Sequence, residues 1–79
     1  MARLNFEVGA LVVSGDGIQL GTLKELATDR FKVERRVLPD YWLAMEYVDH
    51  AGDGLVQMIL TKEGIYAARV DAPRPTTGA

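Results

Sequence analysis

Apolar and polar residues alternate with a period of two along much of this chain. The pattern is clearest in DRFKVERR, where Phe31 and Val33 share one face and Arg30, Lys32 and Glu34 share the other. Successive side chains of a strand point to opposite faces, so this segment is predicted to be a strand whose Phe31 face is buried.

Four more segments have the β-branched or aliphatic composition of strands and end at turn residues: residues 8–14, 18–26, 41–45 and 55–60. The tetrapeptides SGDG and AGDG predict tight turns after the first strand and before the last one, because Gly and Asp tolerate positive φ angles. In residues 18–26 the alternation is lost next to Gly21, which predicts a β-bulge or a sharp bend there. Curved strands of this kind are what a small barrel needs.

The remaining elements are short. Residues 46–50 are predicted to form one helical turn, with Tyr47 and Val48 against the core. Thr61 suits a helix N-cap, and a helix is expected over residues 62–68. Residues 1–70 therefore form a single domain, whereas residues 71–79, DAPRPTTGA, are expected to be a disordered tail.

Size and charge narrow the function. The chain has 79 residues, no cysteine and a net charge of −2. A domain this small buries a thin core, which favours self-association or a protein partner. The charge offers no general attraction to nucleic acid, and the longest apolar run is too short for membrane insertion. The N-terminal sequence lacks the apolar segment of a secretory signal, so a cytoplasmic location is expected.

Three patterns invite a chemical interpretation, and each has a simpler one. SGDGIQLG lacks the glycine spacing and the following helix of a dinucleotide loop, so it is interpreted as a hairpin turn. DHAGDG places no carboxylates in the register of a calcium loop. Ser14 and His50 are the only serine and histidine, and a triad built on them is a remote possibility. We therefore expect no catalytic residues, no cofactor and no metal.

The candidate partner-binding residues are Arg35, Arg36, Tyr41 and Trp42. The strand from Arg30 to Arg36 carries an excess of positive charge, which can be a solvated face, a protein-contact patch or an RNA contact. Tyr41 and Trp42 are adjacent and must point to opposite faces, so one of them lies outward, beside Arg35 and Arg36. The sequence leaves open which one.

The chain resembles the PRC-barrel family, which is named from the photosynthetic reaction centre H subunit. The resemblance runs from about residue 8 to residue 65 and rests on VVSGDGIQLGTLKEL, LAMEYV and VQMILTKEGI. Ala44 stands where the family usually has proline, and Thr61-Lys62-Glu63 looks like small stand-alone members of unknown function. The resemblance implies an all-β fold, a small and strongly bent β-barrel with a short C-terminal helix. It also implies an assembly or interaction role, since the family has no common catalytic residues.

The leading hypothesis is therefore a non-enzymatic protein-interaction domain, expected to be a homodimer, that docks onto itself or onto another protein. An RNA- or ribosome-associated module that uses residues 30–36 is the alternative. A small hydrolase or ligand-binding enzyme is a third hypothesis, and it requires a pocket in which polar groups converge.

Overall fold

The computed structural model describes residues 5–70 of the chain. In this part of the chain the strands are β1 (Leu11–Val13), β2 (Gln19–Leu26), β3 (Arg30–Glu34), β4 (Tyr41–Ala44), β5 (Val48–Gly52), β6 (Leu55–Met58) and β7 (Arg69–Val70). A 3-10 turn, η1 (Met45–Tyr47), joins β4 to β5, and one helix, α1 (Lys62–Ala67), follows β6. The fold is all-β with one short helix, as predicted. The expected tail at residues 71–79 lies outside the described residues.

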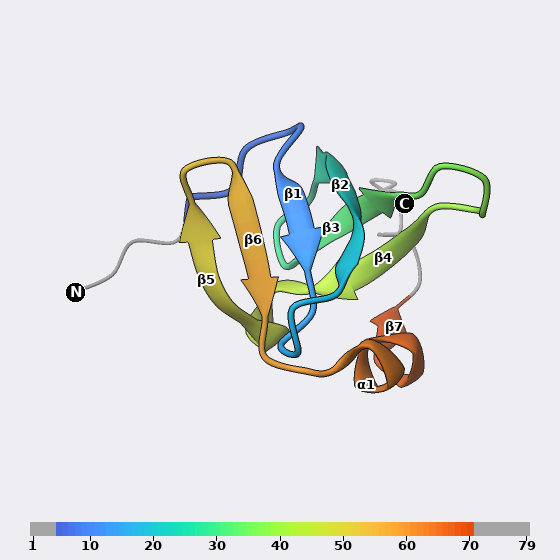
Figure 1. Cartoon of the computed structure of the whole chain (residues 1–79). Coiled ribbons are helices and arrows are strands. Elements are labelled where there is room, and N and C mark those ends of the chain that lie inside the picture. Colours follow the sequence, from blue (N-terminus) through green and yellow to red (C-terminus); the bar gives the residue numbers. More distant parts are fainter. Residues whose placement is uncertain (1–4, 71–79) are drawn as a thin grey trace, which may run out of the picture.

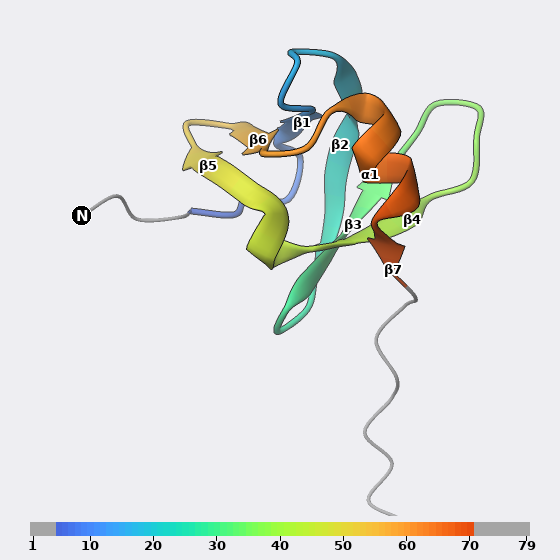
Figure 2. The ribbon, with the colours of Figure 1, turned by 90° about the horizontal axis from the view of Figure 1, so that it is seen from below.

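The strands form one seven-stranded sheet in the order β5-β6-β1-β2-β3-β4-β7 (Figure 1). Neighbouring strands of the sheet are antiparallel, except that β1 and β6 are parallel to each other. The sheet bends so strongly that η1 carries the chain directly from β4, near one edge, to β5 at the other edge (Figure 2). β5 and β7 remain its two edge strands, so the hydrogen-bonded ladder itself is open.

The β1–β2 hairpin confirms the interpretation of SGDG as a turn. The Ser14 side chain accepts a hydrogen bond from the Ile18 amide (3.0 Å) and donates one to Asp16. The register of the hairpin shifts between Val12 and Val13, which pair with Gly21 and Gln19, so the predicted irregularity is present beside Gly21. A second shift, at Lys24 between β2 and β3, was not predicted.

Gly21 is required by a close approach of two strands. A Cβ atom at this position would lie 2.3 Å from the carbonyl oxygen of Glu34 in β3 and 2.9 Å from a methyl group of Val33. Only a residue without a side chain lets the bent β2 pass this close to the end of β3.

One apolar cluster fills the inside of the bent sheet. Phe31 and Val33 are fully buried, as predicted, and they pack with side chains from the other strands and from α1: Val12, Leu23, Leu43, Val56, Met58 and Ile65. The outward neighbours of these residues in β1 and β6, Leu11, Val13 and Leu55, are only half-buried.

Several predicted boundaries were wrong. The first strand starts at Leu11, three residues later than predicted, because Ala10 bonds back to Glu7 in a turn and Gly9 has φ +96°. The predicted helical turn over residues 46–50 is η1 followed by β5, since His50 pairs with Gln57 of β6. β7 was not predicted at all.

The remaining helix prediction is confirmed. Thr61 caps α1 by accepting a hydrogen bond from the Gly64 amide, and the helix ends at Ala67, one residue earlier than predicted. Ile65 is the buried residue of α1 and anchors it to the core. Within residues 5–70 no helix has the length and apolar character needed to span a membrane.

Candidate protein-interaction surface

The connection between β3 and β4, residues 35–40, projects from the sheet on the side of α1 (Figure 1). We refer to it as the 35–40 loop. The guanidinium of Arg35 donates two hydrogen bonds to the carbonyl oxygen of Pro39, at 2.9 Å from Nε and 2.7 Å from Nη2. These bonds span the loop and hold its two ends together.

Arg35 also fixes the loop against the rest of the domain. Its guanidinium lies 4.6 Å from the ring centroid of Tyr41 in β4 and 5.8 Å from that of Tyr66 in α1. Nη1 of Arg35 donates to the Tyr66 hydroxyl at 3.2 Å, and the two tyrosine rings stack with centroids 6.4 Å apart. A cation that lies against two aromatic rings and whose donors are bonded has little freedom, so the loop is held in a defined conformation.

The tip of this loop is apolar. Val37 is 90% exposed and Leu38 is 52% exposed. Isolated exposed aliphatic residues are ordinary on protein surfaces. Here the two are consecutive, on a loop held by five Arg35 contacts, and that combination is typical of a surface that another molecule covers.

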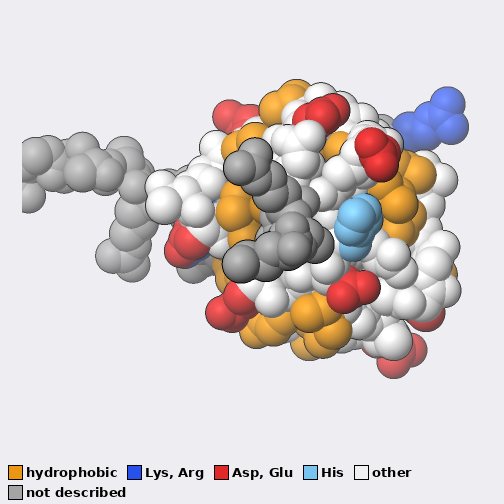
Figure 3. All heavy atoms as spheres, turned by 90° about the vertical axis from the view of Figure 1, so that its left-hand side faces the viewer, with side chains coloured by type: hydrophobic (Ala, Val, Ile, Leu, Met, Phe, Trp, Pro, Cys, Tyr) orange, Lys and Arg blue, Asp and Glu red, His pale blue; other side chains and the backbone are white. Residues whose placement is uncertain are grey.

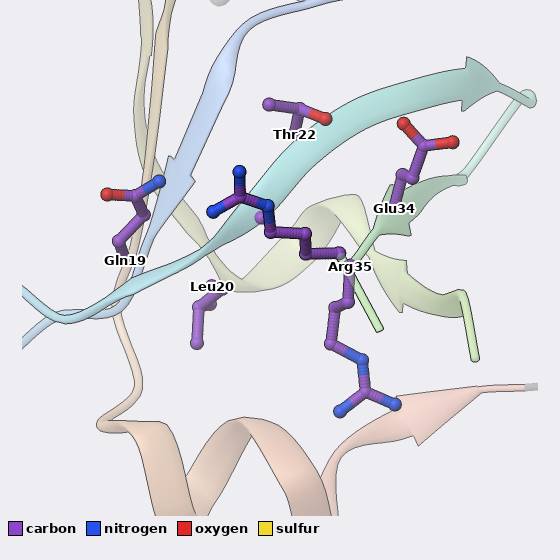
Figure 4. Close-up of a pocket in the computed structure, with 7 residues that line it drawn as sticks. Gln19, Leu20, Thr22, Glu34 and Arg35 are labelled. Atoms are coloured by element: carbon purple, nitrogen blue, oxygen red, sulfur yellow. The ribbon is translucent and has the colours of Figure 1, made fainter. Parts of the chain in front are cut away.

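An open groove lies between this loop and β2. Its larger part has a volume of about 800 Å³ and is lined by residues of β2, of the end of β3 and of the start of the loop: Gln19, Leu20, Gly21, Thr22, Glu34, Arg35 and Arg36 (Figure 4). A smaller hollow of about 260 Å³ shares Gln19, Leu20, Arg35 and Arg36 and adds Val37, Leu38, Tyr41, Lys62 and Tyr66. We call the two together the β2–β3 groove.

The smaller hollow of the groove is basic. Arg35, Arg36 and Lys62 line the smaller hollow, and no carboxylate does. Glu34, in the larger part, forms an ion pair with Lys24 at 3.3 Å. By contrast, the face that carries β5 and β6 shows scattered acidic side chains and the single histidine, with Lys and Arg colour only at its margin (Figure 3).

Burial and charge act on the tyrosine beneath Arg35. Tyr41 is 7% exposed, and its burial raises the pKa of its phenol, while the positive charge of Arg35 opposes that rise. The phenol therefore stays protonated near neutral pH, and its ring serves as an apolar platform rather than as a charged group.

The four residues predicted to bind a partner separate into two places. Arg35, Arg36 and Tyr41 line the groove, whereas Trp42 lies on the opposite face of the sheet, paired with Lys32 and Val70. Trp42 is thus the outward aromatic residue. The expectation that this residue lies beside Arg35 and Arg36 was wrong, because the aromatic ring under Arg35 is the inward Tyr41.

The positive charge of β3 is largely matched by acids. Nζ of Lys32 lies 3.3 Å from Oε2 of Glu25 and 3.8 Å from Oδ2 of Asp40. Nε of Arg30 lies 2.9 Å from Oδ1 of Asp29. Arg30 and Lys32 are therefore parts of mixed-charge clusters rather than of a continuous basic stripe.

Comparison of this chain with protein-family models, with curated proteins and with solved structures gives no match. The surface must be interpreted from its own residues.

The groups considered for catalysis and metal binding are not assembled. The Ser14 side chain is fully buried and bonded to Asp16, whereas His50 is exposed on β5, separated from β1 by β6. Among residues 5–70 no three side chains of the His, Cys, Asp and Glu type form a metal-binding group.

Sequence reasoning missed Leu20, Val37, Leu38, Lys62 and Tyr66 as groove residues. An aliphatic pair between Arg36 and Pro39 was a local signal for the loop tip. Tyr66 had no such signal, since its contact with Arg35 joins residues 31 positions apart.

Proposed function

We propose that this chain is a non-enzymatic protein-interaction domain and that it binds its partner through the 35–40 loop and the β2–β3 groove. The observation that carries the proposal is the exposed Val37–Leu38 pair on a loop that Arg35 holds against Tyr41 and Tyr66. A partner can cover Val37 and Leu38 without first ordering the loop, because Arg35 already holds it. Binding therefore avoids the entropic cost of fixing the loop.

We also propose that the domain is a barrel of the PRC-barrel type. Support comes from the strong bend of the sheet, the irregularity at Gly21 and the single apolar cluster enclosed by the strands. In this arrangement the outer surfaces of the strands and the connecting loops are the parts that can dock. The partner is another protein or a second copy of the chain.

The test is affinity purification of the tagged protein from its own host, with two variants compared. Val37→Asp places a charge on the loop tip and should abolish capture of the specific partner. Ile59→Asp introduces the same charge at an exposed position outside the loop and the groove (57% exposed) and should leave capture unchanged. Equal capture by both variants contradicts the proposal.

Self-association is tested separately by sedimentation at high protein concentration. A dimer that Val37→Asp converts to a monomer identifies the second copy as the partner. If the protein is a monomer, its partner must be another protein, and the affinity purification must then capture that protein.

A further inference from the structure

We infer that the partner enters the β2–β3 groove as an extended peptide segment that adds to β2 and carries a carboxylate two residues from an aliphatic side chain. This inference rests on the proposed interaction function and specifies the chemistry of the partner.

The first observation is an open strand edge inside the sheet. Residues 19–21 of β2 pair with β1 on one side. On the other side β3 pairs with β2 only from Thr22, opposite Glu34, through Leu26, and the chain turns away at Arg35. The edge of β2 at Gln19 and Leu20, before the backbone of Glu34 closes against Gly21, therefore has no strand paired with it where the groove opens, and such an edge accepts an added strand.

The second observation is the shape and lining of the smaller hollow. Leu20, Val37, Leu38, Tyr41 and Tyr66 supply its apolar surface. Its volume of about 260 Å³ lies below the range of roughly 300–1,000 Å³ that is usual for small-molecule pockets. It suits an aliphatic side chain of a docked segment better than a whole ligand.

The third observation is charge. Arg36 and Lys62 form no hydrogen bond or ion pair within the described part of the chain, and Arg35 lies beside them. A carboxylate from a partner complements these two cations, which are exposed at the rim of the groove. A protein whose own net charge is −2 thus offers a local basic site that selects for an acidic segment.

The strand geometry fixes the spacing of the two features. Side chains of an extended segment alternate between faces, so residues that both point into the groove are two positions apart. One of them fills the hollow beside Leu20 and Leu38, and the other brings its carboxylate to Arg36 and Lys62. A phosphate backbone needs a longer row of cations, and the cations of β3 outside the groove are engaged by acids.

The experiment uses the full chain and a phage-displayed library of random peptides of about nine residues, which span roughly 30 Å when extended. Selection on the protein should enrich peptides that carry Asp or Glu two positions from Val, Leu or Ile. A synthetic peptide of the enriched sequence should bind about tenfold more weakly to Arg36→Glu. Arg30→Glu, the same charge reversal at the start of β3 and outside the groove, should leave its affinity unchanged.

Amide NMR of the complex then locates the peptide. Residues 19–22 and 36–38 should shift, and the amides of residues 19 and 20 should gain protection from hydrogen exchange as the strand is added. Shifts without protection overturn strand addition. Enrichment of peptides without a carboxylate, no enrichment at all, or equal loss of binding in Arg36→Glu and Arg30→Glu overturns the inference.

Two outcomes separate this inference from the function on which it rests. If the library fails but Val37→Asp still abolishes capture of the host partner, the interaction function stands and the acidic-segment inference falls. If a single-stranded RNA oligonucleotide displaces the selected peptide, the groove takes phosphate and the inference falls as well.

Discussion

The guanidinium of Arg35 lies 4.6 Å from the ring centroid of Tyr41 while two of its nitrogens donate to the Pro39 carbonyl oxygen. One side chain therefore closes the 35–40 loop and attaches it to the core strand β4. The same guanidinium reaches Tyr66 of α1, so the loop, the sheet and the helix meet at a single residue.

Arg35→Ala should loosen the loop and lower the free energy of unfolding by about 1–2 kcal/mol, since it removes a cation–aromatic contact and hydrogen bonds at a partly exposed site. Urea denaturation measures this change. Arg36→Ala, next in sequence but without these contacts, should change stability by less than about 0.5 kcal/mol.

The contact between Arg35 and Tyr66 can be isolated by a double-mutant cycle with Tyr66→Phe, which removes only the hydroxyl that accepts from Nη1. A coupling energy near zero would show that the two side chains do not cooperate in holding the loop, contrary to this account.

Substitution of Gly21 by Ala should be strongly destabilising, because the new Cβ would lie 2.3 Å from the Glu34 carbonyl oxygen and β3 would have to move. Gly52→Ala is the matched control: there the nearest atom is Nε2 of His50, at 3.8 Å. Thermal unfolding should show a large drop in Tm for the first variant and a small change for the second. Similar Tm values would mean that β2 does not pass β3 this closely.

The carboxyl of Asp40 should titrate below its usual range. The hydrogen bond from Lys24 lowers its pKa, and the same bond raises the pKa of Lys24. Because the folded-state pKa of Asp40 is depressed, its contribution to stability is present above the unfolded-state pKa, about 4, and is lost as the pH falls through the folded-state value. For Lys24 the contribution is present below pH about 10 and is lost as the pH rises through its raised value.

The measurement is an NMR titration of the Asp40 carboxyl carbon. Lys24→Met should move its midpoint upward, toward the ordinary range. Lys62→Met removes a lysine that lines the groove and forms no ion pair with Asp40, and it should leave the midpoint where it is. An unchanged midpoint in Lys24→Met would show that this ion pair is absent in solution.

The sequence pattern was enough to predict those features of the fold that depend on residues close together in the sequence. The alternation around Phe31 and Val33, the SGDG turn, the irregularity at Gly21 and the Thr61 cap each follow from a few neighbouring residues. The helical turn predicted over residues 46–50 is present only as η1, at residues 45–47. The rest of that segment is in β5, because His50 pairs with Gln57 of β6, and this pairing depends on a distant segment. β7 has two residues and exists only through its pairing with Trp42 and Leu43.

The groove could be predicted only in part. Arg35, Arg36 and Tyr41 were recognised from charge and aromatic content. Their arrangement depends on the point at which β3 stops pairing with β2 and on the contact between Tyr66 of α1 and Arg35. Both are tertiary contacts, which the local sequence does not determine. The choice between Tyr41 and Trp42 required the sheet register, which turns Trp42 toward Lys32 on the outer face.

The most direct test of the interaction surface is site-specific photocrosslinking in the host cell. A benzophenone amino acid at position 37, where the native Val37 is 90% exposed, should give a discrete adduct with one protein, or a doubled mass if the partner is a second copy. The same amino acid at position 8, where the native Val8 is 66% exposed and lies outside the groove, should give none. No discrete adduct at position 37, or the same adducts at both positions, would contradict the account.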